Sequence, residues 1–195
     1  MRWLPLVVGA LLSASSPSAT VGSFELTGTV HAGGRPKGDA IVWLEPASAQ
    51  AAAQAAKAKK VVLDQRTSTF FPHVLAVQVG TTVDLPNNDR VFHNVFSFTN
   101  GKPFDLGLYP TGASKRITLD RPAVNRLYCN IHPHMAAYII AVDSPYYATA
   151  DKTGAFTIRD VPAGRYTYHA WRSGAEMLSA TVTVGDGQPF EVAWR

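Results

Sequence analysis

Most of the chain alternates apolar and polar residues, and clusters of Gly, Pro, Asn and Asp interrupt this alternation at short intervals. In residues 74–85, Leu75, Val77 and Val79 occupy every second position, Gly80 marks a turn, and the alternation then resumes. Side chains two positions apart share a face of a strand but not of a helix. The pattern therefore predicts a mostly β protein. Hydrophobic residues make up 46% of the chain, which is enough to build its core.

The only cysteine lies in the same kind of pattern. The segment "RLYC" places Leu127 and Cys129 on one face of a strand. After the loop "NIHPHM", the segment "AAYIIAV" aligns Tyr138, Ile140 and Val142 on one face of the next strand. Cys129 is therefore expected to end a strand inside a β-sandwich.

One segment departs from the alternation. "ASAQAAAQAAKAKK" is rich in Ala, Gln and Lys, which favour helices, and it lacks large apolar side chains that could join a core. Residues 47–59 are therefore predicted to form a short Ala-rich helix or a linker.

The first residues have the order of a secretory signal peptide. Arg2 precedes the apolar run "WLPLVVGALL", and the small-residue stretch "SASSPSAT" follows. The run is shorter than the ~20 residues that span a bilayer. We expect residues 1–20 to be removed on export, with an uncleaved membrane anchor as the alternative. The mature protein is then periplasmic or secreted and has no stable membrane span.

The charge pattern argues against a nucleic-acid partner. The formal net charge is +4, only 16% of residues are charged, and Lys and Arg are scattered except in "KAKK". An enzyme is not expected either, because no Ser-His-Asp set stands out and "GGRPKG" lacks the Lys-Ser/Thr ending of a phosphate-binding loop.

The two ends of the chain carry complementary motifs rich in turns and short strands. The opening motif comprises Gly28, Val30, Gly34, Pro36, Ala40, Val42 and Leu44, and the closing motif comprises Asp151, Gly154, Phe156, Ile158, Val161, Pro162, Gly164 and Tyr166. Together they resemble the transthyretin-like sandwich that occurs as a regulatory domain in carboxypeptidases. We therefore expect residues 21–46 and 144–195 to form one β-sandwich and residues 60–143 to be a domain inserted into it.

The loop after Leu127 gathers residues that bind soft metals. An exported chain with one cysteine cannot form an internal disulfide, so Cys129 should be buried, paired with another molecule or bound to metal. Cys129, His132 and Met135 follow each other at intervals of three, and His93 arrives from another strand. Two His, one Cys and an axial Met form the ligand set of an electron-transfer copper site, whereas zinc more often takes further Cys or His.

The segments "FPHVLAVQVGTTVDLPNNDRVFHNV" and "CNIHPHM" resemble the two signature regions of the cupredoxins, and the loop spacing is that of the amicyanins. The likeness covers residues 60–143 and is also shared with exported methylamine-utilisation proteins. It implies a Greek-key β-sandwich with one type 1 copper ion, held by His93, Cys129, His132 and Met135. It also implies that Asn94 ties the two ligand loops together by hydrogen bonds.

Two further histidines remain open as extra ligands. His134 lies between His132 and Met135, and His73 follows Pro72 at the start of a strand. Each is also compatible with a position on the surface or, for His73, with a role behind the ligands.

Three functions follow from this ligand set and its setting. The first is an exported carrier of single electrons between redox proteins, such as a dehydrogenase and a c-type cytochrome. The second is capture or delivery of copper in the periplasm, by the same ligands. The third is a cell-envelope interaction module in which the flanking sandwich binds the partner and the copper site is incidental.

Overall fold

The computed structural model describes residues 22–46, 60–98, 103–185 and 190–195. The predicted signal peptide and the Ala-rich segment 47–59 lie outside these residues. The described part of the chain contains eighteen strands and no helix, so the predicted all-β class is confirmed. Accordingly, none of it is a helix of the length and hydropathy that crossing a membrane requires.

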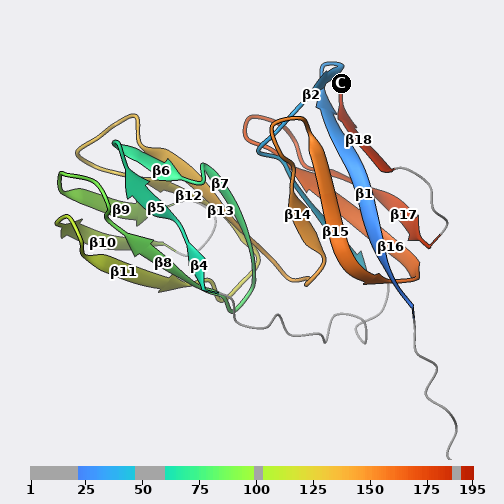
Figure 1. Ribbon diagram of the computed structural model, residues 1–195, viewed down its shortest axis with the longest axis horizontal. Coiled ribbons are helices and arrows are strands. Elements are labelled where there is room, and N and C mark those ends of the chain that lie inside the picture. Colours follow the sequence, from blue (N-terminus) through green and yellow to red (C-terminus); the bar gives the residue numbers. More distant parts are fainter. Residues whose placement is uncertain (1–21, 47–59, 99–102, 186–189) are drawn as a thin grey trace, which may run out of the picture.

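The strands form two β-sandwiches side by side (Figure 1). The first sandwich combines both ends of the chain. One of its sheets has the order β15-β1-β18, with β2 paired to β1, and the other has the order β14-β3-β16-β17. Its strands are β1 (Ser23–Ala32), β2 (Arg35–Pro36), β3 (Ile41–Pro46), β14 (Tyr147–Thr149), β15 (Ala155–Pro162), β16 (Gly164–Trp171), β17 (Leu178–Val184) and β18 (Phe190–Trp194).

The second sandwich is built from the middle of the chain. Its sheets have the orders β10-β9-β12-β13-β7 and β11-β8-β4, and β5 and β6 form a hairpin beside them. Its strands are β4 (Val61–Val62), β5 (Asp64–Arg66), β6 (Thr69–Phe71), β7 (Val74–Gln78), β8 (Thr82–Pro86), β9 (His93–Ser97), β10 (Phe104–Tyr109), β11 (Ser114–Thr118), β12 (Ala123–Tyr128) and β13 (Ala136–Val142). The chain thus leaves the first sandwich, builds the second, and returns.

Each sandwich has its own hydrophobic core, and the alternation of the sequence explains both. In the first, Val42 and Leu44 of β3 are fully buried against residues of the facing sheet such as Val30. In the second, Leu127 of β12 and Val83 of β8 are fully buried in the same way. Side chains at every second position of these strands therefore stabilise the fold by removing apolar surface from water.

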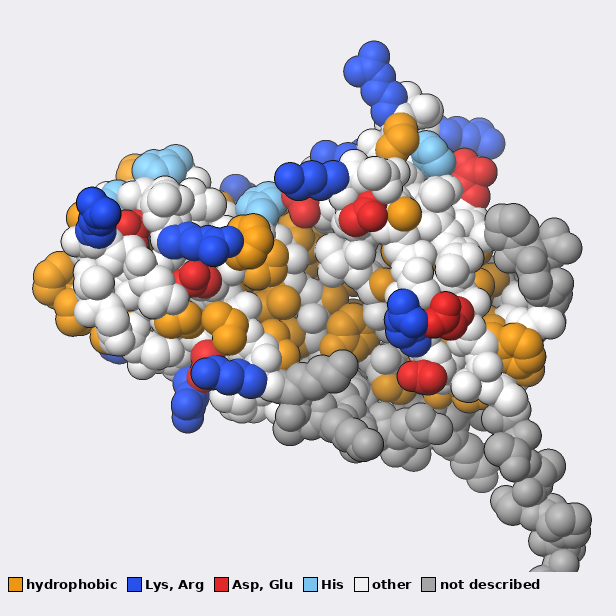
Figure 2. Space-filling view, in the orientation of Figure 1, with side chains coloured by type: hydrophobic (Ala, Val, Ile, Leu, Met, Phe, Trp, Pro, Cys, Tyr) orange, Lys and Arg blue, Asp and Glu red, His pale blue; other side chains and the backbone are white. Residues whose placement is uncertain are grey.

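The two sandwiches pack against each other through a third cluster. Strand β13 is buried on both faces, because Ala137, Ile139 and Ala141 join the core of the second sandwich whereas Ile140 and Val142 face the first. Ile41, Val74 and Trp171 complete this cluster, with Tyr138 packed against it. Figure 2 shows hydrophobic side chains gathered along the furrow between the sandwiches. The face predicted to align Tyr138, Ile140 and Val142 is therefore the interface between the two sandwiches.

Candidate metal centre

The candidate ligands come from the ends of three strands of one sheet. His93 is the first residue of β9, Cys129 directly follows β12, and Met135 directly precedes β13. The loop from Cys129 to Met135 is closed by two backbone hydrogen bonds, from Met135 N to His132 O (2.9 Å) and from Cys129 N to Met135 O (3.3 Å). This loop lies at the end of the second sandwich away from the first (Figure 1). Paired strands hold the ligands, so their spacing is rigid.

Three ligand atoms converge on one point. Cys129 Sγ lies 3.9 Å from His93 Nδ1 and 3.6 Å from His132 Nδ1. All three atoms lie within 4.8 Å of one another, and this is the one such group of His, Cys, Asp and Glu found among the described residues. A nitrogen and a sulfur bound to a common metal at 120° would be about 3.8 Å apart, given bond lengths of about 2.0 to 2.3 Å. The spacing therefore fits a metal held by all three.

The site is shielded from water on one side and open on the other. His93 is fully buried, Cys129 is 4% exposed and Met135 is 1% exposed. His132 is only partly buried. A thiolate, two imidazoles and a buried thioether are donors that suit copper better than Mg, Ca or Mn. The residues present therefore fit a copper ion, with His132 as the ligand nearest to solvent.

A carboxylate that the sequence analysis did not single out holds His93 in place. Asp89 Oδ2 lies 2.9 Å from His93 Nε2. Because a carboxylate can only accept this hydrogen bond, Nε2 carries the proton and Nδ1 presents its lone pair toward Cys129. A carboxylate behind a ligating histidine fixes its orientation and raises its basicity.

Asp89 is itself held by backbone N–H groups. Ser68 N donates to its Oδ2 (2.6 Å) and Arg90 N to its Oδ1 (2.7 Å). The hydrogen bonds from Ser68 and from His93 lower the pKa of Asp89 to about 2. Its carboxylate is therefore ionised at neutral pH and remains an acceptor for His93.

Buried polar side chains fix the loop that carries Asp89 and leads to His93. Asn87 is fully buried, and its Nδ2 donates to Val91 O (2.8 Å) and Tyr109 O (3.1 Å). Tyr109 donates from its hydroxyl to Leu85 O (3.0 Å) and accepts a hydrogen bond from the buried Gln65. Burial raises the pKa of Tyr109 to about 12, so this hydroxyl stays protonated. The network joins β5, β8 and β10 beneath the ligand loop.

Asn94 makes a different contact from the one expected. Its Nδ2 donates to Asp105 Oδ1 (2.7 Å), and its Oδ1 is buried without a hydrogen-bond partner among the described residues. This hydrogen bond links β9 to β10 and does not reach the loop from Cys129 to Met135. The hydrogen bond behind His93 is accepted by Asp89, which contacts Ser68 and Arg90 besides His93.

The two histidines considered as extra ligands, His73 and His134, lie in different places. His134 is exposed, and its ring centroid is 6.1 Å from that of His132. His73 lies at the interface between the sandwiches, with Nδ1 3.8 Å from Asp39 Oδ2 and its ring edge against Tyr138. Neither belongs to the three-residue group of ligand atoms.

Comparisons with solved structures found similarity to copper proteins. A purple cupredoxin from Nitrosopumilus maritimus is 25% identical, with 43% of this chain and 100% of that chain covered and a TM-score of 0.39. A Cu-containing nitrite reductase from Thermus scotoductus SA-01 is 27% identical over 50% of this chain and 25% of its own length, with a TM-score of 0.42. A reduced Cu(I) amicyanin mutant is 21% identical over 52% of this chain and 98% of that chain, with a TM-score of 0.41.

Comparison of the sequence with family models found a match to part of the chain only. The family described as "Polysaccharide lyase family 4, domain II" matches residues 141–191, which belong mainly to the first sandwich. That family, and not a transthyretin-like one, is thus the match found for this flank. No curated protein matches the chain.

Proposed function

We propose that the second sandwich binds one type 1 copper ion and that the protein carries single electrons. The observation that supports this most strongly is the convergence of His93 Nδ1, Cys129 Sγ and His132 Nδ1 within 4.8 Å, beside a buried Met135. We infer that His93, Cys129 and His132 would hold the metal and that the thioether of Met135 would be a further, weaker ligand. Bound copper would supply a one-electron couple.

The residues around the site suit electron transfer more than chemistry on a substrate. Asp89 holds the His93 imidazole in one tautomer, and the buried neighbours of Cys129 keep water from the thiolate. Ligands fixed by sheet hydrogen bonds move little when the charge of the site changes, which keeps the barrier to electron transfer low. We therefore propose electron transfer without a catalytic step.

We propose that a redox partner, such as a c-type cytochrome or a dehydrogenase, docks at the end of the sandwich where His132 is partly exposed. Residues next to the ligands in sequence leave apolar surface there: Phe92 is 55% exposed, Val91 44% and Ile131 45%. Apolar surface of this kind favours brief encounters with another protein. The leader-like first residues support a periplasmic or secreted location for these encounters.

We propose further that the first sandwich is transthyretin-like. Gly154, one of its motif glycines, has φ +79°, and a Cβ there would lie 2.5 Å from Val30 O. The motif thus requires glycine at the point where the closing segment contacts the opening one. A cell-envelope interaction through this sandwich is the alternative function that its separate core would allow.

Copper delivery is the second candidate, and exposed His134 favours it. An imidazole beside His132 could accept copper as the ion leaves the site. A carrier of electrons should instead retain its copper, so the rate of copper exchange separates the two functions.

The test is to add one equivalent of Cu(II) to the mature chain and to record visible absorption and EPR spectra. We expect an intense thiolate-to-copper band with narrow hyperfine splitting, absent from Cys129→Ser and retained in the matched imidazole control His134→Gln. The loaded protein should exchange electrons with a cytochrome c and keep its copper against a chelator for hours. A colourless protein, or spectra unchanged by Cys129→Ser, would refute the copper site, and release of copper within minutes would favour delivery.

A further inference from the structure

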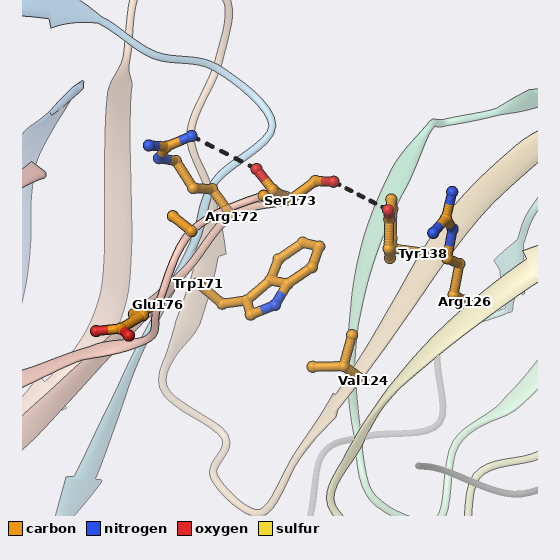
Figure 3. A pocket seen from close by; sticks show the side chains of 9 residues that line it. Val124, Arg126, Tyr138, Trp171, Arg172, Ser173 and Glu176 are labelled. Carbon is orange, nitrogen blue, oxygen red and sulfur yellow. Dashed lines mark hydrogen bonds between the residues drawn. The ribbon is translucent and has the colours of Figure 1, made fainter. Parts of the chain in front are cut away.

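Strand β17 (Leu178–Val184) is the last strand of its sheet and has a neighbour on one side only. It pairs with β16, and no strand of the described residues pairs with its other side. The rest of this sheet is next to the second sandwich, because Tyr147 of β14 packs against the cluster between the sandwiches. Directly after β16, Ser173 Oγ donates to the Tyr138 hydroxyl of the second sandwich (2.9 Å; Figure 3). The unpaired edge of β17 lies on the side away from the second sandwich (Figure 1).

Other edge strands carry features that hinder pairing with another chain. Strand β15 contains Arg159 and Pro162, β18 contains Glu191, and β11 contains Lys115 and Arg116. Strand β10 has a shift of register against β9. Strand β17 differs from all of these, because its seven residues, LSATVTV, include no charge and no Pro, and its register with β16 is unbroken. A long, regular and uncharged edge is a template for a further strand.

The two faces of β17 are chemically distinct. The side chains alternate, so that those of one face point to the core and those of the other face point to solvent. The first face has Leu178, Ala180, Val182 and Val184, and the second has Ser179, Thr181 and Thr183. Leu178 and Val182 pack against the core but are only partly buried. Apolar surface at the rim of the core is therefore still in contact with water along this edge.

A second copy of β17 matches this edge. Opposed residues of antiparallel strands lie on the same face of the sheet, and a shift of one residue would place the apolar face opposite the hydroxyl face. A twofold axis at Thr181 pairs all seven residues, and it places apolar side chains opposite apolar ones and hydroxyls opposite hydroxyls. The protein already contains a pair of this second kind, because Thr82 Oγ1 and Thr118 Oγ1 are 2.8 Å apart across β8 and β11.

Charge does not oppose this arrangement. Arg165 is the one Lys, Arg, Asp or Glu within β16 and β17, and it lies beside Thr183. A twofold axis at Thr181 places the two copies of Arg165 at opposite ends of the paired strands. The two guanidinium groups are therefore kept apart.

We propose that two copies of this chain associate through β17, antiparallel about a twofold axis at Thr181. The two four-stranded sheets then form one continuous sheet, in which the unpaired N–H and C=O groups of each edge bond to the other copy. The contact is isologous, so it closes as a dimer. It also removes the rim residues Leu178 and Val182 from water. The association does not depend on copper.

The test is sedimentation velocity of the full mature chain, without metal and with a reductant that keeps Cys129 from cross-linking chains. We expect the mass to rise from that of one chain toward that of two between low and high micromolar concentration. Thr181→Lys and Thr181→Glu each place two like charges opposite one another at the axis, and each should weaken association at least tenfold. An equimolar mixture of the two variants should associate again, because unlike charges then face each other.

Thr167→Lys is the matched control, because Thr167 is exposed on the same face and pairs with Thr181 from β16 but is not at the edge. It should leave association unchanged. A chain that stays monomeric at every concentration would overturn the proposal, and this is also the result if another segment of the same chain covers the edge. A dimer that both charged variants leave intact, or a mixture that does not recover, would show that the copies meet elsewhere and would overturn it too.

Hydrogen exchange of the unsubstituted chain provides a measurement that needs no variant. The backbone amides of β17 should exchange more slowly at high than at low protein concentration, whereas those of β15, the edge of the facing sheet, should not change. Equal exchange of the β17 amides at both concentrations would contradict the pairing.

Discussion

Substituting Asp89 by Asn tests whether the hydrogen bond behind His93 shapes the metal site. The two side chains have the same size, but one oxygen becomes an NH2 group that can only donate. Asp89 accepts from His93 and Ser68 on one oxygen and from Arg90 on the other. In either orientation of the amide, its NH2 group therefore faces another N–H donor, either those of His93 and Ser68 or that of Arg90.

The orientation that places NH2 against His93 has a direct effect on the metal ligand. His93 Nε2 must then give up its proton to act as the acceptor, so the proton moves to Nδ1, the atom 3.9 Å from Cys129 Sγ. A protonated Nδ1 cannot bind a metal. Loss of a hydrogen bond behind a metal ligand commonly weakens metal binding 10- to 100-fold, or by about 1.4 to 2.8 kcal/mol.

The measurement is the affinity of the full mature chain for Cu(I), in competition with a chromophoric chelator. Asp105→Asn is the matched control, because it perturbs the hydrogen bond from Asn94 in the same sheet without touching a ligand. Urea unfolding of the metal-free variants shows whether both remain folded. Unchanged affinity in Asp89→Asn, or an equal loss in Asp105→Asn, would refute the role given to Asp89.

Two further predictions concern stability. Ile140→Ala removes a buried side chain from the interface between the sandwiches, and Ile139→Ala removes its neighbour from the core of the second sandwich. Each should lower the free energy of unfolding in urea by about 2 to 5 kcal/mol. Only Ile140→Ala should also expose the boundary between the sandwiches to proteolysis, and identical cleavage patterns would contradict this. The pKa of Asp151 lies below its ordinary value of 3.8 because Thr153 donates to its carboxylate. The contribution of this carboxylate to stability is therefore present above about pH 4 and is lost as the pH falls through the lower folded pKa. Asp151→Asn should thus lower the free energy of unfolding more at pH 6 than at pH 2.5, and an equal loss at both would contradict the assignment.

The strands could be predicted because the alternation of apolar and polar residues that indicates them is a local pattern. Alternation near Leu127 and Val83 reports which side chains are buried, and the intervals between Cys129, His132 and Met135 report a shared loop. Each of these two patterns spans only a few consecutive residues. The pairing of strands distant in the chain, such as β1 with β15, was predictable only through the complementary motifs of the flanks.

Asp89 could not be identified in the same way. Its contact with His93 depends on the path of residues 87–92, and that path is fixed by Gln65 and Tyr109, which are distant in sequence. A turn rich in Asn and Asp has the same composition whether or not one carboxylate reaches a histidine. The partner of Asn94 on β10 likewise depends on strand register, which no local pattern reports.

The interface explains how an inserted sandwich can present a rigid site. Strand β13 begins directly after Met135, and its outer face packs on Ile41 and Trp171 of the first sandwich. After β13 the chain enters the first sandwich within a few residues, where Ser144 Oγ donates to Leu44 O (2.5 Å). The candidate ligand Met135 is therefore anchored to a strand that is buried on both faces. Removing the first sandwich would expose one of these faces to water, so the flanks stabilise the strand that carries the end of the ligand loop.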